Sequence, residues 1–174
     1  MPSTSPKFTV ALLDSKIHDR AAFSCGEPSL DDYLKRRASQ DLKRRLAVTY
    51  VLAPCDEPAR VAGYFTLSAY AVLASELPEE LAACLPRHDR FPTTLIGRLA
   101  RDGAYRGDRL GELLLLEALT RALENSDRVA SFAVVVDALN DQAAAFYQRY
   151  GFLPFADDAR RLYLPMATVK TLLS

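Results

Sequence analysis

A six-residue stretch, RGDRLG at 106–111, places arginine and glycine between an apolar run and a strongly apolar helical segment. The apolar run at 94–100 predicts a strand, and the segment from about Arg109 predicts a helix. The first turn of a helix has backbone N–H groups without intrahelical partners, and the helix dipole adds about half a positive charge there. Gly107 and Gly111 would let the backbone approach a ligand closely. The stretch is therefore predicted to bind an anion such as pyrophosphate.

A second candidate for chemistry is a tyrosine in the segment LNDQAAAFYQRYGF at 139–152. Asn140 or Asp141 is a candidate N-cap, which predicts a helix with Tyr147 in its middle. A phenol held beside a leaving group can donate a proton to it. The same helix carries Phe146 and Tyr150, so the residues by themselves favour Tyr147 as a core aromatic residue.

Composition restricts the class of protein. At 174 residues the chain suits one domain, 1–174, with a single core. Lys and Arg together number 22, as do Asp and Glu, so any nucleic-acid partner must be met by a local basic patch. The three cysteines are widely spaced, without a CxxC pair or a histidine cluster, which argues against a disulfide framework and a metal site and favours the cytoplasm. No signal peptide or membrane-spanning run is recognisable, so we expect a soluble protein.

A basic helical segment follows the first predicted strand. A helix, or two consecutive helices, is predicted from Pro28 or Ser29, because an apolar residue recurs every four positions from Leu30 to Leu46. The other faces carry six cations, which together are called the basic helix face: Lys35, Arg36, Arg37, Lys43, Arg44 and Arg45. Such a face is either simply solvated or a surface for phosphate groups.

The remaining pattern predicts alternating strands and helices. An antiparallel hairpin is expected from two β-rich runs at 48–53 and 61–69, and a strand covered on both faces from the apolar run at 132–138. Further predictions are a strand at 7–13, a helix at 77–85, a polar loop at 86–94, a last strand at 160–169 and a tail at 170–174.

The predicted anion-binding stretch at 106–111, named the anion turn below, follows the middle strand, and an N-x6-Y pattern follows the next strand. This order of elements resembles the GNAT superfamily of acetyl-CoA-dependent N-acyltransferases. Their pyrophosphate motif, Q/R-x-x-G-x-G/A, is matched at Arg106 and Gly111, but Arg109 stands where glycine is usual. The resemblance implies an α/β fold. Its central sheet is mixed and mostly antiparallel, with about six to seven strands, a splay between strands 4 and 5, and helices on both faces.

The resemblance also implies site residues. The pantetheine arm of acetyl-CoA would lie in the splay, held by backbone groups of Leu99 and Ala100, which would also polarise the thioester carbonyl. Asn140 would bond the cofactor arm, and Tyr147 would protonate the leaving thiolate. The residues expected to hold the pyrophosphate are Arg106, Gly107, Arg109, Leu110 and Gly111.

A narrower resemblance comes from five segments, FSCGEPSLDDYLKRRASQD, GYFTLSA, IGRLARD, VVVDALND and AFYQRYGFLPF. Together they are similar to the acetyltransferase toxins of type II toxin-antitoxin systems, which acetylate the amino group of aminoacyl-tRNA and block translation. This implies a homodimer and a cognate antitoxin of the ribbon-helix-helix kind. The basic helix face, with Arg87, Arg90 and Arg98, would contact tRNA phosphates, unless Arg98 is instead buried and paired in its strand.

No general base is evident, and an α-amine with a pKa of about 7.7 needs little help to lose its proton. Two alternatives remain open. The same chemistry would serve a small amine or a protein N-terminus. A catalytically inactive acetyl-CoA-binding module would account for the departure at Arg109 from the superfamily motif.

Overall fold

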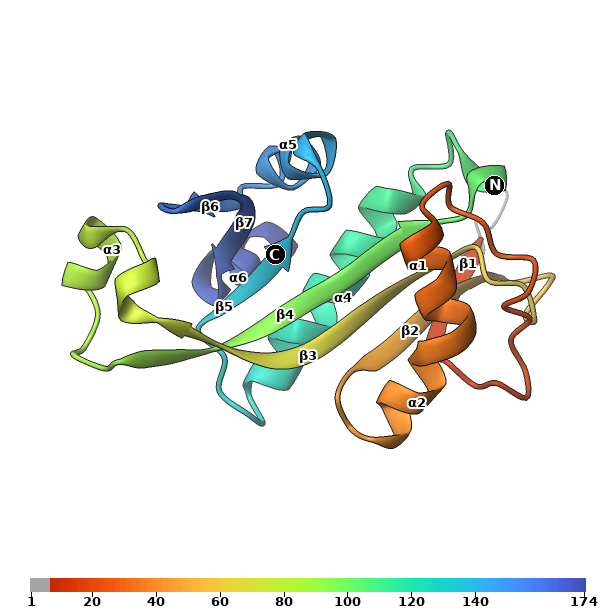
Figure 1. The fold of residues 1–174 in the computed structure, drawn as a ribbon, viewed down its shortest axis with the longest axis horizontal. Coiled ribbons are helices and arrows are strands. Elements are labelled where there is room, and N and C mark those ends of the chain that lie inside the picture. The colour runs from red at the N-terminus through yellow and green to blue at the C-terminus, as the bar shows by residue number, and fades with distance from the viewer. Residues whose placement is uncertain (1–6) are drawn as a thin grey trace. The chain divides into compact units, whose positions relative to one another are not determined.

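The computed structural model describes residues 7–174, whose strands form one seven-stranded sheet in the order β1-β2-β3-β4-β5-β7-β6 (Figure 1). The strands are β1 (Phe8–Leu12), β2 (Val48–Pro54), β3 (Gly63–Leu73), β4 (Arg90–Arg101), β5 (Ala133–Asp137), β6 (Leu153–Phe155) and β7 (Asp158–Pro165). The α-helices are α1 (Pro28–Asp32), α2 (Ala38–Lys43), α3 (Glu79–Ala83), α4 (Leu110–Ser126), α5 (Asp141–Arg149) and α6 (Met166–Leu173). A π-helix, η1 (Tyr33–Arg37), joins α1 to α2, and two short 3₁₀ helices are η2 (Ala74–Glu76) and η3 (Gly103–Tyr105).

The sheet is mixed, as the resemblance to the GNAT superfamily implies. Strands β1 and β2, β2 and β3, β5 and β7, and β6 and β7 pair antiparallel, which confirms the hairpin of β2 and β3. Strands β4 and β5 pair in parallel, with Thr93–Ile96 opposite Ala133–Val136. This ladder uses only four residues of the twelve-residue strand β4, which continues to Arg101. The α/β fold class is confirmed.

The chain divides into two compact units. Unit 1 holds the residues up to Leu67 together with Arg98–Ala118, and unit 2 holds Ser68–Gly97 together with Leu119–Ser174. Strands β3 and β4 and helix α4 each contribute residues to both units. The expectation of a single domain over 1–174 stays a prediction.

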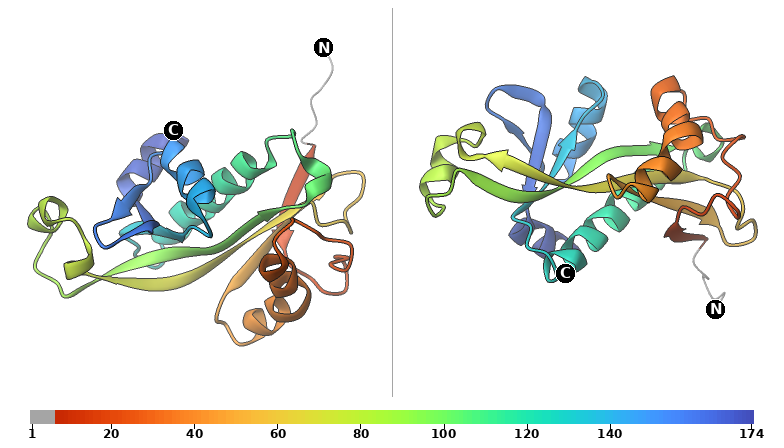
Figure 2. Two further views of the ribbon diagram at one scale, coloured as in Figure 1. Left: turned by 45° about the horizontal axis from the view of Figure 1, so that its top comes forward. Right: turned by 60° about the horizontal axis from the view of Figure 1, so that its bottom comes forward.

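In unit 1, the two faces of β3 are covered by different helices, because successive strand residues point to opposite sides. Tyr64 is fully buried and stacks on Tyr33 of η1 at 6.4 Å between ring centroids, and its hydroxyl donates to the Leu30 carbonyl at 2.6 Å. Gly63 points the other way, where an added Cβ would lie 2.8 Å from Leu114 of α4. Hence α1 and η1 cover one face of this part of the sheet and α4 covers the other (Figure 2).

In unit 2, β5 is the central strand, with all of Ala133–Val136 buried, as its continuous apolar run predicts. Helices α5 and α6 both contact β7. An aromatic cluster also forms, in which Phe155 and Tyr163 lie 5.1 Å apart between ring centroids, together with Phe91. These contacts give unit 2 a core of its own.

The loop predicted at 86–94 is wrong over its second half, because β4 begins at Arg90. Phe91 and Thr93 are buried and Pro92 between them is exposed, which is the alternation of a strand. Proline is tolerated near the start of a strand, where its missing N–H costs least. The Pro92 carbonyl still accepts a hydrogen bond from the Phe132 amide at 2.7 Å.

The last predicted strand, 160–169, is wrong in its second half. Strand β7 ends at Pro165, and Met166–Leu173 forms helix α6, which takes in most of the expected tail. Met166 and Val169 are buried three residues apart, which is a helical spacing. Strand β6 is a further addition, because three residues are too few to give a periodic signal.

Candidate active site

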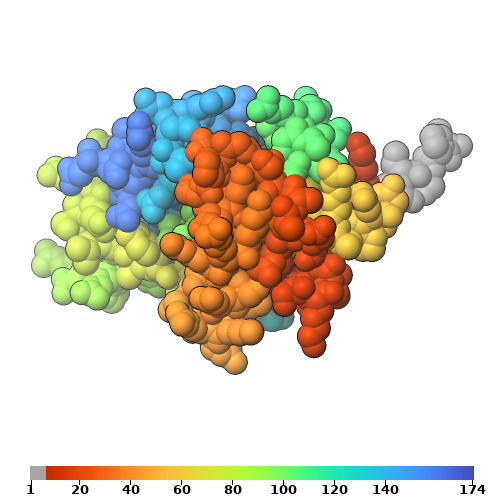
Figure 3. All heavy atoms as spheres, turned by 45° about the vertical axis from the view of Figure 1, so that its right-hand side comes forward, coloured from red at the N-terminus to blue at the C-terminus, as the bar shows by residue number. Residues whose placement is uncertain are grey.

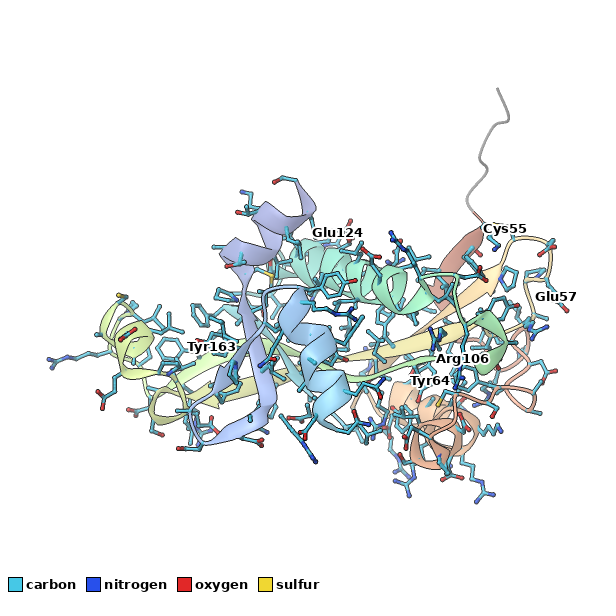
Figure 4. The ribbon with its side chains drawn as sticks, turned by 90° about the horizontal axis from the view of Figure 1, so that it is seen from above. Cys55, Glu57, Tyr64, Arg106, Glu124 and Tyr163 are labelled. Atoms are coloured by element: carbon cyan, nitrogen blue, oxygen red, sulfur yellow. The ribbon has the colours of Figure 1, made fainter. Side chains whose placement is uncertain are left out.

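The anion turn of unit 1 lies between β4 and α4, and Figure 4 labels Arg106 on it. Gly107 has φ +89° and Arg109 has φ +53°, so both adopt the left-handed conformation. Helix α4 then begins at Leu110, and the Leu113 amide donates to the Arg109 carbonyl at 3.1 Å. A left-handed residue explains why glycine is usual at this motif position. Arg109 adopts the same geometry at a cost of roughly 1–2 kcal/mol.

The turn brings the five predicted pyrophosphate residues together on one continuous segment. Arg106, Gly107 and Arg109 are exposed, whereas Leu110 is buried and offers only its backbone N–H. The neighbouring Asp108 carboxylate forms an ion pair with Lys7 at 3.3 Å, so its negative charge is compensated. An exposed turn with left-handed residues, arginines and free helix N–H groups fits a pyrophosphate.

Leu99 and Ala100 lie on the last residues of β4, in the same unit as the turn. An added Cβ on Gly63 would come within 3.1 Å of the Ala100 carbonyl oxygen. The absence of a side chain at Gly63 therefore permits the close approach of β3 to this part of β4.

Asn140 lies in unit 2 and caps helix α5, as predicted, with its side-chain oxygen accepting from the Ala143 amide at 2.8 Å. Its side-chain NH₂ is the group that remains for a ligand. Gly151, two residues after the end of α5, adopts a left-handed conformation with φ +95°. A role for Asn140 in holding the cofactor stays a prediction.

Tyr147 lies on α5 and is only 7% exposed. Its ring packs edge-on against Phe146 and Phe152, with ring centroids 5.3 and 5.4 Å away. Burial raises the pKa of the Tyr147 phenol above its ordinary value, and no charged neighbour opposes this shift. The hydroxyl therefore stays protonated at neutral pH, as a proton donor must.

Two arginines that the sequence did not single out hold the junction between β5 and α5 in unit 2. Arg160 Nε donates to Asp141 Oδ1 at 3.1 Å, at the first residue of α5. Arg161 Nε donates to Asp137 Oδ1 at 3.1 Å, at the last residue of β5, and its Nη1 reaches Glu76 Oε1 at 3.4 Å. Both lie in the first half of β7 and meet their carboxylate partners only in the folded sheet, so no sequence pattern indicated these contacts.

The basic helix face is exposed in unit 1, and Figure 3 shows its helices, in orange, at the surface. Its members are Lys35, Arg36, Arg37, Lys43, Arg44 and Arg45, all exposed. The helix changes to π geometry at Tyr33–Arg37, and Arg20 Nη1 donates there to the Leu34 carbonyl at 3.1 Å and to Ser39 Oγ at 3.0 Å. Arg20 thereby satisfies a carbonyl in the irregular turn.

The other three predicted tRNA-contacting arginines are placed differently. Arg98 is half-buried, with its guanidinium 3.6 Å from the centroid of the Tyr33 ring, a cation–π contact. Arg87 and Arg90 are exposed but belong to unit 2. The predicted cofactor residues divide in the same way, since Asn140 belongs to unit 2 and the others to unit 1.

Within residues 7–174, no three His, Cys, Asp or Glu side chains gather in a way that could hold a metal ion. Among the helices of this described part, none has the length and apolar character needed to span a bilayer.

The sequence profile of the Acetyltransferase (GNAT) family matches residues 16–152. The chain belongs to this family. It is 31% identical over 168 residues to a probable toxin TacT of Sinorhizobium fredii, covering 92% of each chain. It is 33% identical over 159 residues to a tRNA-acetylating toxin of Mycobacterium tuberculosis, covering 91% of this chain and 93% of the relative.

Solved structures of similar proteins have the same fold as this GNAT acetyltransferase. A tyrosine-to-phenylalanine variant of KacT superposes with a TM-score of 0.88 at 27% identity, covering 95% of this chain and 99% of KacT. AtaT complexed with acetyl-methionyl-tRNAfMet superposes with a TM-score of 0.87 at 25% identity, covering 96% and 99%. The enzyme is thus an acetyltransferase with acetyl-CoA as its acyl donor.

Two substitutions at Arg109 separate backbone geometry from charge. Arg109→Gly removes the left-handed strain and Arg109→Ala keeps it, so we expect the glycine variant to be more stable than the alanine variant by about 1 kcal/mol. Both lose a cation from the predicted pyrophosphate site, so we expect both to bind acetyl-CoA roughly fivefold to tenfold more weakly than the parent. Thermal unfolding and calorimetric titration measure the two effects. Parental affinity in both variants would contradict a phosphate contact of the guanidinium.

Proposed function

We propose that this acetyltransferase transfers the acetyl group of acetyl-CoA to the α-amino group of an aminoacyl-tRNA, and that it acts as a toxin by blocking translation. The observation that carries the proposal is the 33% identity, over 91% of the chain, to a relative named as a tRNA-acetylating toxin. The exposed basic face of unit 1 supports it, because phosphates of a nucleic acid bind such a surface.

The proposed site residues either hold acetyl-CoA or donate a proton to its sulfur. The turn of Arg106, Gly107, Arg109, Leu110 and Gly111 holds the pyrophosphate, and backbone groups of Leu99 and Ala100 hold the pantetheine arm. Bound acetyl-CoA supplies the acetyl group as a reactive thioester. Asn140 bonds the cofactor arm, and Tyr147 donates a proton to the departing sulfur.

The acceptor amine needs little activation. A peptide α-amino group has a pKa of about 7.7, and an ester on the same amino acid lowers that pKa further by withdrawing electrons. A large share of the amine is therefore neutral at pH 7, whereas a lysine side chain, with a pKa of about 10.4, would need a base. The lack of an identified base in the site favours an α-amine acceptor.

The decisive experiment measures transfer of labelled acetyl from acetyl-CoA to total charged tRNA, with uncharged tRNA in parallel. We expect label on the charged pool alone, and sequencing of the labelled tRNA then names the amino acid. A polyamine and a set of peptides with free N-termini are tested beside it. Label on one of these, and none on tRNA, would overturn the tRNA proposal. Bound acetyl-CoA without any acceptor would indicate an inactive binding module.

The partners follow from the same proposal. We propose a homodimer of single-domain chains in the cytoplasm, where charged tRNA is found, silenced by a small antitoxin of the ribbon-helix-helix kind. The structures of similar proteins include an AtaT-AtaR complex bound to DNA, with a TM-score of 0.76 at 25% identity. Co-expression with the neighbouring gene and sizing of the purified complex test both partners.

A further inference from the structure

A buried carboxylate that the proposed mechanism does not use lies where β4 meets the pyrophosphate turn. Asp102 is only 7% exposed, although charged side chains are rarely so buried without partners. Its Oδ2 accepts from the Ser24 amide at 3.0 Å and its Oδ1 from the Ala104 amide at 2.8 Å. Both oxygens therefore bind backbone N–H groups from two different segments of unit 1.

Backbone hydrogen bonds strengthen the same connection between Ser24 and the residues that follow β4, which is called the Asp102 joint below. The Gly103 amide donates to the Ser24 carbonyl at 2.9 Å, so Ser24 is bonded to the turn through both its amide and its carbonyl. The Asp102 amide donates to the Ala62 carbonyl at 2.8 Å, next to the start of β3. Asp102 thus joins the N-terminal segment, strand β3 and the beginning of the turn.

The Asp102 joint continues toward the basic helix face. The Cys25 amide donates to Asp31 Oδ1 at 2.9 Å, which attaches the segment after Ser24 to helix α1. On the other side, Asp102 caps η3, whose last residue, Tyr105, directly precedes Arg106. The position of the turn is therefore fixed from a segment about eighty residues earlier in the chain.

We propose that Asp102 is the positioning residue of the acetyl-CoA site, which holds the pyrophosphate turn in place by anchoring it to Ser24. This inference rests on the assignment of the turn to acetyl-CoA in the proposed function. Asp102 acts through the backbone that it orders. Both of its oxygens accept from backbone N–H groups, which stabilises the buried carboxylate where it lies.

Asp102→Asn tests the role. The asparagine oxygen keeps one acceptor, but its NH₂ faces the other backbone N–H, so one charge-assisted bond is replaced by a repulsive contact. We expect the Kd of acetyl-CoA, measured by calorimetry, to rise about tenfold or more, the equivalent of one such hydrogen bond. The KM for acetyl-CoA should rise in parallel, with kcat within about twofold of the parent. Asp56→Asn, at an exposed aspartate of the same unit, is the control and should change neither.

A measurement on the unmodified chain keeps the inference testable if the variant folds poorly. Amide hydrogen exchange at Ser24 and Ala104 should slow several-fold when acetyl-CoA binds, because the ligand stabilises the turn to which both amides are bonded. Unchanged exchange at Ser24, or a destabilised Asp102→Asn that still binds acetyl-CoA with parental Kd, would overturn the positioning role. The Kd and the hydrogen exchange need no acceptor, and KM and kcat can be measured with any amine that the enzyme acetylates. A failure of the tRNA proposal would therefore leave these results as they stand.

Discussion

Replacing Tyr147 by phenylalanine is expected to lower kcat for acetyl transfer by about 10²–10⁴-fold, the usual contribution of a general acid. The substitution removes only the hydroxyl from a ring that is packed between Phe146 and Phe152. Since that hydroxyl has no hydrogen-bond partner within residues 7–174, we expect the thermal stability to stay close to that of the parent. Binding of acetyl-CoA should also change little.

The pH profile of the parent enzyme provides a second readout. Burial raises the pKa of the Tyr147 phenol above its ordinary value of about 10, so the donor form is present at every lower pH. The rate should therefore rise with pH as the acceptor amine loses its proton, with an apparent pKa of about 7.7 or less, and should not fall again below pH 10.

The matched control is Tyr150→Phe on the same helix turn. Tyr150 is the C-cap of α5 and packs against Phe146 at 5.2 Å between ring centroids, so it loses the same group in a similar setting. We expect this control to keep kcat within about threefold of the parent. A similar, small loss in both variants would exclude Tyr147 as the proton donor.

Removing three cations from the basic helix face is expected to weaken tRNA binding by about 10–10³-fold at physiological salt. The variant combines Lys35→Ala, Arg37→Ala and Lys43→Ala, three exposed side chains of unit 1. Each lost phosphate contact should also reduce the slope of log K against log salt by about one. Filter binding at several salt concentrations measures both quantities, and the Kd of acetyl-CoA should not change.

A control must remove the same charge from elsewhere. Lys16→Ala, Arg128→Ala and Lys170→Ala together remove three exposed cations outside the basic helix face. This control should retain most of the tRNA affinity, because phosphate contacts depend on position as well as on net charge. Equal affinities and salt slopes for the two triple variants would show that the basic helix face is merely solvated.

Local sequence patterns predicted the parts of the fold that depend on neighbouring residues. The N-cap at Asn140 follows from a residue type that suits that position, and the structure confirms it. The departure at Arg109 was visible in the sequence, but its left-handed backbone was not, because an arginine gives no signal for φ.

Features held by distant contacts were out of reach of such patterns. The π geometry at Tyr33–Arg37 goes together with Arg20, which bonds the Leu34 carbonyl from fourteen residues earlier. Asp102 and Ser24 are 78 residues apart in the sequence, so their bond exists only once the chain has folded. Residue type alone marked neither Arg20 nor Asp102 as important.

The parallel pairing of β4 with β5 has a consequence for the order in which the molecule forms. The hairpin of β2 and β3 closes a short loop, whereas the parallel ladder joins Thr93 to Ala133, about forty residues later. Contacts so distant in sequence form late, and a chain folds from its N-terminus while the ribosome is still extending it. Helix α5 comes later still. The proposed acetylation of aminoacyl-tRNA should therefore begin only once synthesis of the chain is almost complete.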